Sequence, residues 1–288
     1  MRWAERCFSS LLHSNVKPDV IVIDNGSNDG TQDFIKSYFP DAIIYQSSNN
    51  LGFGKANNIG LQYALDHNYD YVYLLNQDAW LLPNTLECLI ELSVKYPDYG
   101  ILSPFQMNAD MCTIDRNFAS TVCSWNSNHQ LLSDLYNKKL SDIYSVKSVM
   151  AAHWFMPIST VKEIGGFSPS FPHYGEDDNY LSRLLFRNLK IGIVPALRVV
   201  HDRGGRIETS EMRIYKGYIS SILAISDPYY SLFKGLIMSV YYLLYNMVLY
   251  KSLKPILFFF KMLFNLHSII MNKRDSINRS CAFLNCCS

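Results

Sequence analysis

Residues 20–31, Val-Ile-Val-Ile-Asp-Asn-Gly-Ser-Asn-Asp-Gly-Thr, indicate how this chain folds. Its four consecutive β-branched side chains are typical of a strand that is buried on both faces of a parallel sheet. The polar run that begins at Asp24 ends this strand and predicts a turn. Helical patterns separate this strand from two further apolar runs, at residues 42–45 and 71–75. The β-α-β-α-β order predicts an α/β fold with a mostly parallel sheet flanked by helices.

The rest of the chain adds further short strands and helices. An apolar stripe predicts a helix over residues 2–14, and Pro83 opens another helix that ends near Tyr96. Residues 108–144 are polar and irregular, and we interpret them as an insertion of undefined structure. Further strands are predicted at residues 100–103, 189–194 and 197–200, and residues 146–155 are again apolar.

Length and composition describe a globular protein with a full hydrophobic core. The 288 residues are 49% hydrophobic and 18% charged, with a formal net charge of +1. This charge gives no bias toward nucleic acid, so we expect no nucleic-acid partner. The N-terminus lacks the apolar core of a signal peptide, which favours a cytoplasmic location. The seven cysteines form no Cys-x-x-Cys pair, which favours reduced, mostly buried thiols over a zinc site or a disulfide framework, with Cys286 and Cys287 in a frayed tail.

Polar side chains follow several of the predicted strands. Asp24 comes after the first strand, Asp78 after the third and His201 after the last. Ligands of open α/β sheets bind beyond the carboxyl ends of the strands. Asp24 has an equally good alternative role as a turn former or helix cap. Asp78 lies among apolar residues, where a carboxylate is costly unless it is paired or bound to a metal. His153 lies inside an apolar segment, and we interpret it as a buried histidine without a ligand.

Three consecutive acids, Glu176, Asp177 and Asp178, precede an apolar pattern with helical spacing. They follow a turn at Pro172 and Gly175, so they lie at a helix N-terminus. The unsatisfied N–H groups and the macrodipole stabilise carboxylates there, and a capped helix is the simplest interpretation. The acids and the histidine at the ends of other predicted strands favour a catalytic role instead.

Five motifs follow one another along the chain. They are Val-Ile-Asp-Asn-Gly-Ser-Asn-Asp-Gly-Thr (22–31), Asn-Leu-Gly-Phe-Gly-Lys-Ala-Asn-Asn-Ile-Gly (50–60), Leu-Leu-Asn-Gln-Asp-Ala (74–79), Gly-Gly-Phe (165–167) and Tyr-Gly-Glu-Asp (174–177). Together they resemble the family 2 inverting glycosyltransferases with a GT-A fold, particularly the rhamnosyltransferase-like bacterial members. In that family the first motif resembles the nucleotide-binding turn, the second the donor loop that follows, the third the Asp-x-Asp region, and the last two the acceptor and base region.

This resemblance implies metal-dependent transfer from a nucleoside-diphosphate sugar. Asp24 would contact the nucleobase, while Asp78 and His201 would hold Mg²⁺ or Mn²⁺ on the donor diphosphate. A hard cation neutralises the charge that develops on the leaving phosphate. Asp177 would be the base that takes the proton of the acceptor hydroxyl, with Glu176 as the alternative. The implied acceptor is a surface glycan on a lipid carrier. The residues implied to bind the donor are Asp24, Asn25, Ser27, Asn50, Gly52, Lys55, Asn58 and Asn76.

The chain departs from the family pattern in two places. Asn76 stands where the first Asp of Asp-x-Asp is expected, which leaves the metal with fewer charged ligands. The family's first strand, a central one whose turn touches the nucleotide, would lie before Arg2. We therefore expect that the true start lies upstream or that this is a truncated copy. A catalytically degenerate copy is one alternative function, and a glycoside hydrolase, which also uses two carboxylates, is another.

The C-terminal part combines apolar runs with basic residues. Residues 228–274 contain no Asp or Glu but six Lys or Arg. Two apolar runs, 236–250 and 256–270, are each about fifteen residues, or about 23 Å as helix, which is short of the ~30 Å hydrocarbon core. We therefore expect interfacial helices, peripheral on the inner face of the cell membrane, against an anionic membrane surface. A helical subdomain or an oligomer interface is the alternative. The expected parts are a GT-A-like domain at 1–210, a membrane-associating helical extension at 211–274 and a disordered tail at 275–288.

Overall fold

The computed structural model describes residues 2–123, 125–203 and 208–286, which form two compact units. The first, which we call the sheet unit, comprises Met1–Leu51, Ile59–Thr160 and Asn188–Gly204. The second, the helical unit, comprises Gly52–Asn58, Val161–Arg187 and Gly205–Ser288. This division differs from a boundary at residue 210, because two earlier segments of the chain pack with the C-terminal helices.

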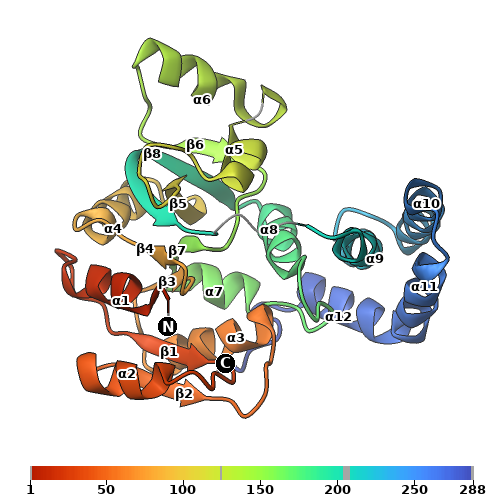
Figure 1. Ribbon diagram of the computed structural model, residues 1–288. Helices are drawn as coiled ribbons and strands as arrows, with labels where there is room; N and C mark the ends of the chain where they lie inside the picture. The colour runs from red at the N-terminus through yellow and green to blue at the C-terminus, as the bar shows by residue number, and fades with distance from the viewer. Residues whose placement is uncertain (1, 124, 204–207, 287–288) are drawn as a thin grey trace. The chain divides into compact units, whose positions relative to one another are not determined.

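The sheet unit contains two sheets (Figure 1). β1 (Ile21–Asp24) and β2 (Ile43–Gln46) form a parallel pair, connected by α2 (Thr31–Tyr38). The third predicted strand, β3 (Tyr71–Leu75), belongs to the second sheet, whose order is β3-β7-β5-β8-β4 with β6 paired to β8. The remaining strands are β4 (Ala79–Trp80), β5 (Tyr99–Met107), β6 (Tyr144–Val146), β7 (His153–Pro157) and β8 (Lys190–His201).

The predicted α/β class is confirmed, but the sheet is mixed where a mostly parallel one was expected. β1–β2 and β5–β8 run parallel, whereas β3–β7, β5–β7, β4–β8 and β6–β8 run antiparallel. Parallel neighbours need a long crossover connection, usually a helix. In this chain α2 connects the parallel pair β1–β2, whereas the antiparallel pairs β3–β7 and β4–β8 join strands that lie far apart in the sequence.

Helices account for the rest of the sheet unit. The predicted N-terminal helix is α1 (Ala4–Leu12), and the helix that Pro83 precedes is α4 (Thr85–Lys95). The segment expected to be irregular contains α5 (Arg116–Val122) and α6 (Trp125–Asn137). Asp115 explains the start of α5, because its side chain accepts a hydrogen bond from the N–H of Phe118 at 2.7 Å and so caps the helix. α3 (Phe53–Asp66) and α7 (Ile158–Ile164) each begin in one unit and end in the other.

The core of the sheet unit lies on β5, β7 and β8. Leu102, Phe155 and Val194 are buried there together, and the two strands predicted at 189–194 and 197–200 form the single strand β8. His153 is fully buried on β7, as the sequence indicated. Its Nδ1 lies 2.8 Å from the hydroxyl of Tyr73 and its Nε2 lies 2.9 Å from a backbone carbonyl, and desolvation lowers its pKa to about 3.

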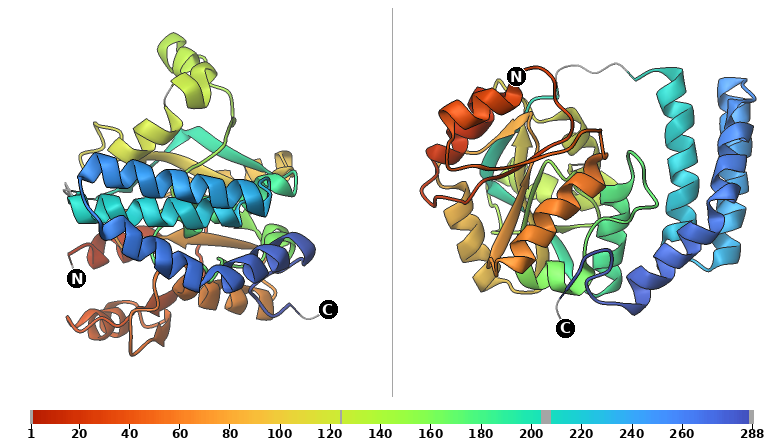
Figure 2. Two further views of the ribbon diagram at one scale, coloured as in Figure 1. Left: turned by 90° about the vertical axis from the view of Figure 1, so that its right-hand side faces the viewer. Right: turned by 90° about the horizontal axis from the view of Figure 1, so that it is seen from below.

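The helical unit is built from α8 to α12. Side chains from α9, α11 and α12 share one buried cluster, and α9 and α10 lie side by side (Figure 2). Both α9 and α10 begin with a hydroxyl cap: Thr209 accepts from the N–H of Met212 and Ser231 from the N–H of Lys234. The helices are α8 (Glu176–Phe186), α9 (Ser210–Ser226), α10 (Leu232–Tyr250), α11 (Lys254–Phe264) and α12 (Leu266–Asn278).

The C-terminal helices are longer and more bent than the apolar runs predicted. The run at 236–250 lies in α10, whose 19 residues correspond to about 28 Å, close to the thickness of a hydrocarbon core. The run at 256–270 is broken at Asn265 into α11 and α12, which meet at a 59° bend. Within the described residues, α10 alone is long and apolar enough to cross a membrane, and the count becomes two if the bent pair is treated as one span.

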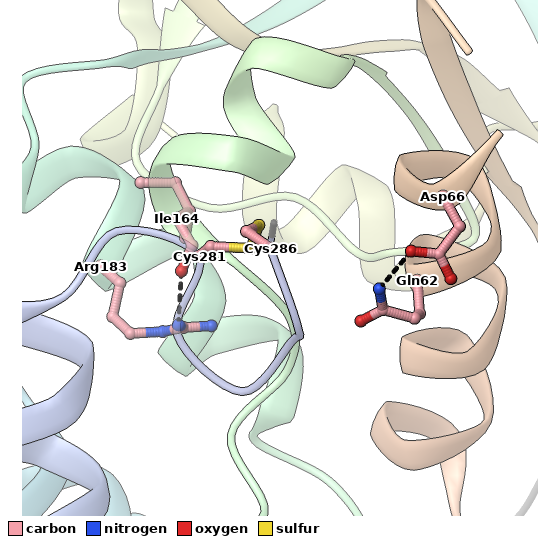
Figure 3. Close-up of a disulfide and its surroundings, with 6 residues drawn as sticks. All are labelled: Gln62, Asp66, Ile164, Arg183, Cys281 and Cys286. Atoms are coloured by element: carbon pink, nitrogen blue, oxygen red, sulfur yellow. Dashed lines mark hydrogen bonds between the residues drawn. A yellow bond between two sulfur atoms is a disulfide. The ribbon is translucent and has the colours of Figure 1, made fainter. Parts of the chain in front are cut away.

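The residues after α12 form an ordered loop where a disordered tail was expected from residue 275. The N–H of Gly166 donates to the carbonyl of Ala282 at 2.8 Å, and the guanidinium of Arg187 donates to the carbonyl of Ile277 at the same distance. Cys281 and Cys286 form a disulfide in this loop (Figure 3), which corrects the expectation of reduced thiols throughout. Cys287 lies outside the described residues. The free cysteines that the structure describes are Cys7, Cys88, Cys112 and Cys123.

Candidate functional site

Asp24 ends β1, and its carboxylate organises the turn that follows. It is buried, with Oδ1 accepting a hydrogen bond from the N–H of Ser27 at 3.1 Å and Oδ2 accepting one from the side-chain amide of Gln32. Burial alone would raise the pKa of Asp24, but the hydrogen bonds from Ser27 and Gln32 outweigh it and hold the pKa below its ordinary value. The turn-forming role that the sequence left open is therefore present. The carboxylate is ionised and fixed in position.

Asn25 joins this turn to the loop that follows β2. Its Oδ1 accepts a hydrogen bond from the N–H of Leu51 at 2.6 Å, and its Nδ2 donates to Oδ1 of Asn50 at 2.9 Å. Gly26 allows the close approach, because it has a φ of +88° and a Cβ there would lie 3.3 Å from the backbone of Asn49. The two loops therefore carry four of the predicted donor-binding residues together: Asp24, Asn25, Ser27 and Asn50.

Asp78 and His201 meet where β4 pairs with the end of β8. Ala79 lies opposite His201 in that antiparallel pair, and the N–H of Asp202 donates to the carbonyl of Asp78 at 2.8 Å. The pairing brings Oδ1 of Asp78 to 3.6 Å from Nε2 of His201, and both side chains are buried. Nε of Arg203 donates to Nδ1 of His201 at 3.3 Å, which fixes the orientation of the imidazole.

Asn76 lies two residues before Asp78 on the tight turn between β3 and β4. The N–H of Ala79 donates to the carbonyl of Asn76 at 3.1 Å, which closes the turn. Within the described residues no group of three or more His, Cys, Asp or Glu side chains is arranged to hold a metal ion. A cation beside Asp78 and His201 would therefore need further ligands from outside this set of side chains.

In the helical unit, the second half of the predicted donor loop packs against the Gly-Gly-Phe turn. The side chain of Asn58 donates to the carbonyl of Phe167 at 2.9 Å and accepts from its N–H at 2.7 Å. A Cβ at Gly166 would lie 2.5 Å from Oδ1 of Asn58, and one at Gly54 would lie 2.9 Å from Cβ of Phe167. These residues therefore have packing roles that the sequence did not reveal, and a contact of Asn58 with the donor stays a prediction.

The three acids at the start of α8 have different environments. Glu176 is only 4% exposed, and its Oε2 is buried without a hydrogen-bond partner. Burial raises the pKa of Glu176 to about 7, and the charges of Asp177 and Asp178 add to this effect. Asp177 is half-buried and its Oδ1 accepts from the N–H of Asp178 at 3.0 Å, while Asp178 is exposed. Of the two predicted catalytic acids, Asp177 is the one that a solvent-borne group can reach.

Arg183 supports this segment and was not predicted as part of the site. It lies two turns after Glu176 on α8 and is 2% exposed. Nη1 donates to the carbonyl of Ile164 at 3.1 Å (Figure 3), and Nη2 donates to the carbonyl of Gly166. The guanidinium also lies over the ring of Phe283, 5.2 Å from its centroid. An arginine on the apolar face of the predicted helix was the available signal, since a buried arginine must be paired with acceptors.

The predicted site residues thus fall into two sets. The sheet unit holds Asp24, Asn25, Ser27, Asn50, Asn76, Asp78 and His201, and the helical unit holds Gly52, Lys55, Asn58, Glu176 and Asp177. Within the first set, the loops after β1 and β2 are hydrogen-bonded to each other, and strand pairing brings Asp78 to His201. Within the second, Asn58 holds the Gly-Gly-Phe turn and Lys55 is exposed.

Comparison with known proteins identifies the family. The model of "Glycosyl transferase family 2" matches residues 2–155, which is more than half of the chain. The chain belongs to glycosyl transferase family 2. This confirms the family that the five sequence motifs indicated.

Two curated relatives of this family 2 member are themselves glycosyltransferases. N-acetylglucosaminyl-diphospho-decaprenol L-rhamnosyltransferase from Mycobacterium tuberculosis is 29% identical over 115 residues, which cover 37% of this chain and 38% of the relative. The low-salt glycan biosynthesis hexosyltransferase Agl10 from Haloferax volcanii is 25% identical over 190 residues, which cover 64% of this chain and 59% of the relative. The chain therefore spans less than two thirds of the length of each of these relatives.

Solved structures support the GT-A fold of this family 2 member. TarS 1–349 from S. aureus in complex with UDP-GlcNAc superposes with a TM-score of 0.54 and 13% identity, covering 96% of this chain and 80% of that one. GalNAc-T7 with UDP, GalNAc and Mn²⁺ gives a TM-score of 0.52 and 13% identity, covering 83% of this chain and 52% of that one. At these identities the likeness concerns the fold alone.

Proposed function

We propose that this chain transfers a sugar, with inversion, from a nucleoside-diphosphate sugar to a hydroxyl group of a glycan. Membership of glycosyl transferase family 2 carries the proposal. The hydrogen-bonded loops after β1 and β2 would bind the nucleotide. The fixed carboxylate of Asp24 would accept hydrogen bonds from the nucleobase. The UDP complexes of TarS and GalNAc-T7 support a nucleotide-sugar donor for this fold.

Asp177 would be the base that takes the proton of the acceptor hydroxyl. A positioned carboxylate typically contributes about 10²- to 10⁴-fold to the rate of such a step. The half-buried position of Asp177 on the first turn of α8 leaves it reachable, and the helix N-terminus stabilises its ionised form. Glu176 would help to position this turn from the protein interior, because its own carboxyl is buried.

Asp78 and His201 would hold a divalent cation. Their atoms lie 3.6 Å apart, so one ion could contact both at the usual ligand distances of about 2.0–2.2 Å once the imidazole proton of His201 has moved from Nε2 to Nδ1, which releases the hydrogen bond from Arg203. Mg²⁺ commonly takes one or two protein ligands and completes its shell with phosphate oxygens and water, and imidazole with carboxylate also suits Mn²⁺. The two residues therefore fit such an ion, which when bound would neutralise charge on the leaving diphosphate. GalNAc-T7, solved with Mn²⁺, supports this assignment by its fold.

The helical unit would bring the enzyme to an anionic membrane surface, and the acceptor would be a glycan on a lipid carrier. α10 and α11 expose many large apolar side chains, with Lys251 directly after α10 and Lys254 at the start of α11. Apolar side chains flanked by cations bind anionic headgroups and the acyl boundary beneath them. The decaprenol-linked name of the mycobacterial relative supports a lipid-linked acceptor. We place the chain peripherally on the inner face of the cell membrane. The exposed side chains include Phe233, Ile237, Leu244, Val248, Leu257, Phe260 and Phe264.

Sedimentation with liposomes tests the membrane contact. Val248 on α10 is 78% exposed and Val94 on α4 in the sheet unit is 70% exposed, so the two form a matched pair. We expect binding to liposomes that contain anionic lipid, with Val248→Glu weakening it and Val94→Glu leaving it unchanged. Equal sedimentation of both variants, or full retention of the wild type in the supernatant at low salt, would contradict this part of the proposal.

A panel of nucleotide sugars with Mg²⁺ or Mn²⁺ tests the transfer reaction itself. Thermal shift and donor hydrolysis should identify one donor, and Asp78→Ala should abolish the metal-dependent part of both signals. Asp177→Asn should keep the donor-induced thermal shift and lose transfer. A chain that binds no nucleotide sugar under any of these conditions would instead be a degenerate copy, and hydrolysis of a glycoside without nucleotide would indicate a hydrolase.

A further inference from the structure

A pocket of about 240 Å³ lies in the helical unit, lined by residues of α8, α9 and α10. Its volume corresponds to about eight water molecules at ~30 Å³ each, or one small polar molecule of the size of a single sugar ring. Polar side chains line it from two sides: Asp178, Asn179 and Ser182 on α8, and Ser220 and Asp227 on and just after α9. None of these residues has a role in the mechanism proposed above.

Asn179 has an unpartnered side-chain oxygen, and this observation points to a ligand. Its side chain is 2% exposed and its Oδ1 is buried without a hydrogen-bond partner. Buried polar atoms in folded proteins are nearly always hydrogen-bonded, and Asn179 lines the pocket, so a turn of its carboxamide toward the pocket would let Oδ1 accept from a donor group outside the protein. A hydroxyl of a bound molecule would supply it.

The charges around the pocket favour a neutral, hydroxyl-rich ligand. The carboxylates of Asp178 and Asp227 oppose an anion such as a phosphate. Lys273 lies close by, since its ammonium donates to the carbonyl of Tyr230, another lining residue, and it would repel a cationic ligand. Carboxylates and a carboxamide oxygen accept hydrogen bonds, and serine hydroxyls both donate and accept them. A sugar ring carries several hydroxyls that match such a mixed lining.

The position of the pocket on α8 connects it to the proposed base. Asp178 and Ser182 are four residues apart on α8 and so lie on one face of the helix, and Asp178 directly follows Asp177. Asp227 is held in place, since its Oδ1 accepts from the N–H of Tyr229 at 2.8 Å. We propose that this pocket binds a neutral sugar ring of the acceptor glycan. The inference rests on the proposed glycosyl transfer and assigns the acceptor a subsite on the helical unit.

Saturation-transfer NMR with a panel of methyl glycosides tests the pocket directly, using methyl glucoside, galactoside, mannoside, rhamnoside and N-acetylglucosaminide. At least one glycoside should receive saturation from the wild-type chain. Ser220→Trp should abolish this signal, because the indole would fill the pocket. Asp178→Asn should weaken binding by about ten- to hundredfold, because it removes a charged acceptor. Ser133→Trp on α6 is the matched control: Ser133 and Ser220 are both half-buried and both donate to the carbonyl four residues earlier.

The outcomes separate this inference from the proposed function. Binding of a glycoside that Ser220→Trp removes and Ser133→Trp retains, in variants with wild-type circular dichroism, supports the pocket. Absence of any glycoside signal, or a signal that survives Ser220→Trp at full strength, overturns it. Donor hydrolysis by the wild-type chain without glycoside is measured in parallel. If hydrolysis is present while the pocket fails, the transfer proposal stands alone, and if hydrolysis is absent, the transfer proposal fails.

Discussion

Replacing Glu176 with glutamine should make the protein more resistant to unfolding at alkaline pH. The carboxyl of Glu176 is 4% exposed, with Oε2 buried and unpartnered, so its ionised form is costly in the folded state. Burial raises its pKa from 4.5 to about 7. Glutamine has nearly the same shape and carries no charge at any pH. The substitution therefore removes the cost of ionisation and leaves the packing almost unchanged.

The size and sign of the effect follow from the two pKa values. Between pH 4.5 and about 7 the unfolded chain loses this proton while the folded chain keeps it, so the free energy of unfolding falls as the pH rises. At ~1.36 kcal/mol for each tenfold change in acidity, the rise of the pKa from 4.5 to about 7 corresponds to about 3 kcal/mol of stability, all of it lost above pH 7 and none below pH 4.5. Glu176→Gln should therefore gain up to about 3 kcal/mol over the wild type at pH 8, relative to the difference at pH 4.

Urea denaturation followed by far-ultraviolet circular dichroism at pH 4, 6 and 8 measures this difference. Glu91→Gln provides the control, because Glu91 lies exposed on α4 and the chemical change is identical. The stability difference between Glu176→Gln and the wild type should grow with pH, and that between Glu91→Gln and the wild type should stay constant. A Glu176→Gln difference that is the same at pH 4 and pH 8 would refute the buried-carboxyl account of this site.

Three further substitutions test the packing that the structure describes. In thermal melts, Gly166→Ala should destabilise the chain by about 1–3 kcal/mol, because the new methyl group would press on Oδ1 of Asn58. Gly60→Ala, where a Cβ on α3 meets open space, should be neutral or stabilising. Asn25→Ala should weaken donor binding about tenfold through loss of the contacts to Leu51 and Asn50, with Asn137→Ala at the exposed end of α6 unchanged by calorimetry. Cys286→Ser should lower the free energy of unfolding by about 2 kcal/mol under non-reducing conditions, because it removes the disulfide, and Cys112→Ser should leave it unchanged. If reductant lowers the free energy of unfolding of the wild type and of Cys286→Ser equally, the disulfide is not the cause.

The parts of the fold that the sequence predicted correctly are those governed by local pattern. β1, β3 and α1 appear where apolar runs and helical spacing placed them, because those patterns reflect burial of each segment by itself. Strand direction is a non-local property. The pairing of β3 with β7, about eighty residues later, has no signature within either strand, so the mixed sheet was missed. The length of α10 was underestimated for a related reason: Ser231 caps the helix before the apolar run begins.

Local sequence patterns likewise revealed some residues of the candidate site and missed the roles of others. Asp78 and His201 were recognised because each is a polar residue that follows an apolar run. The antiparallel pairing of Ala79 with His201 explains why their side chains meet. The structural roles of Asn58 and Arg183 were not visible, because both bind backbone carbonyls of distant residues, Phe167 and Gly166. A hydrogen bond to a backbone group leaves no trace in the identity of the partner residue, so only coordinates can reveal it.

The close contact between Gly165 and Ala282 has an evolutionary consequence. Gly165 has a φ of +84°, and a Cβ there would overlap the backbone of Ala282. Two independent pressures therefore keep this position glycine: the backbone conformation and the volume taken by the loop near the C-terminus. In homologues whose chains stop before that loop, the second pressure disappears, and asparagine or aspartate, which tolerate positive φ, become acceptable. Among homologues, non-glycine residues at the position of Gly165 should therefore be confined to chains that lack the loop containing Ala282.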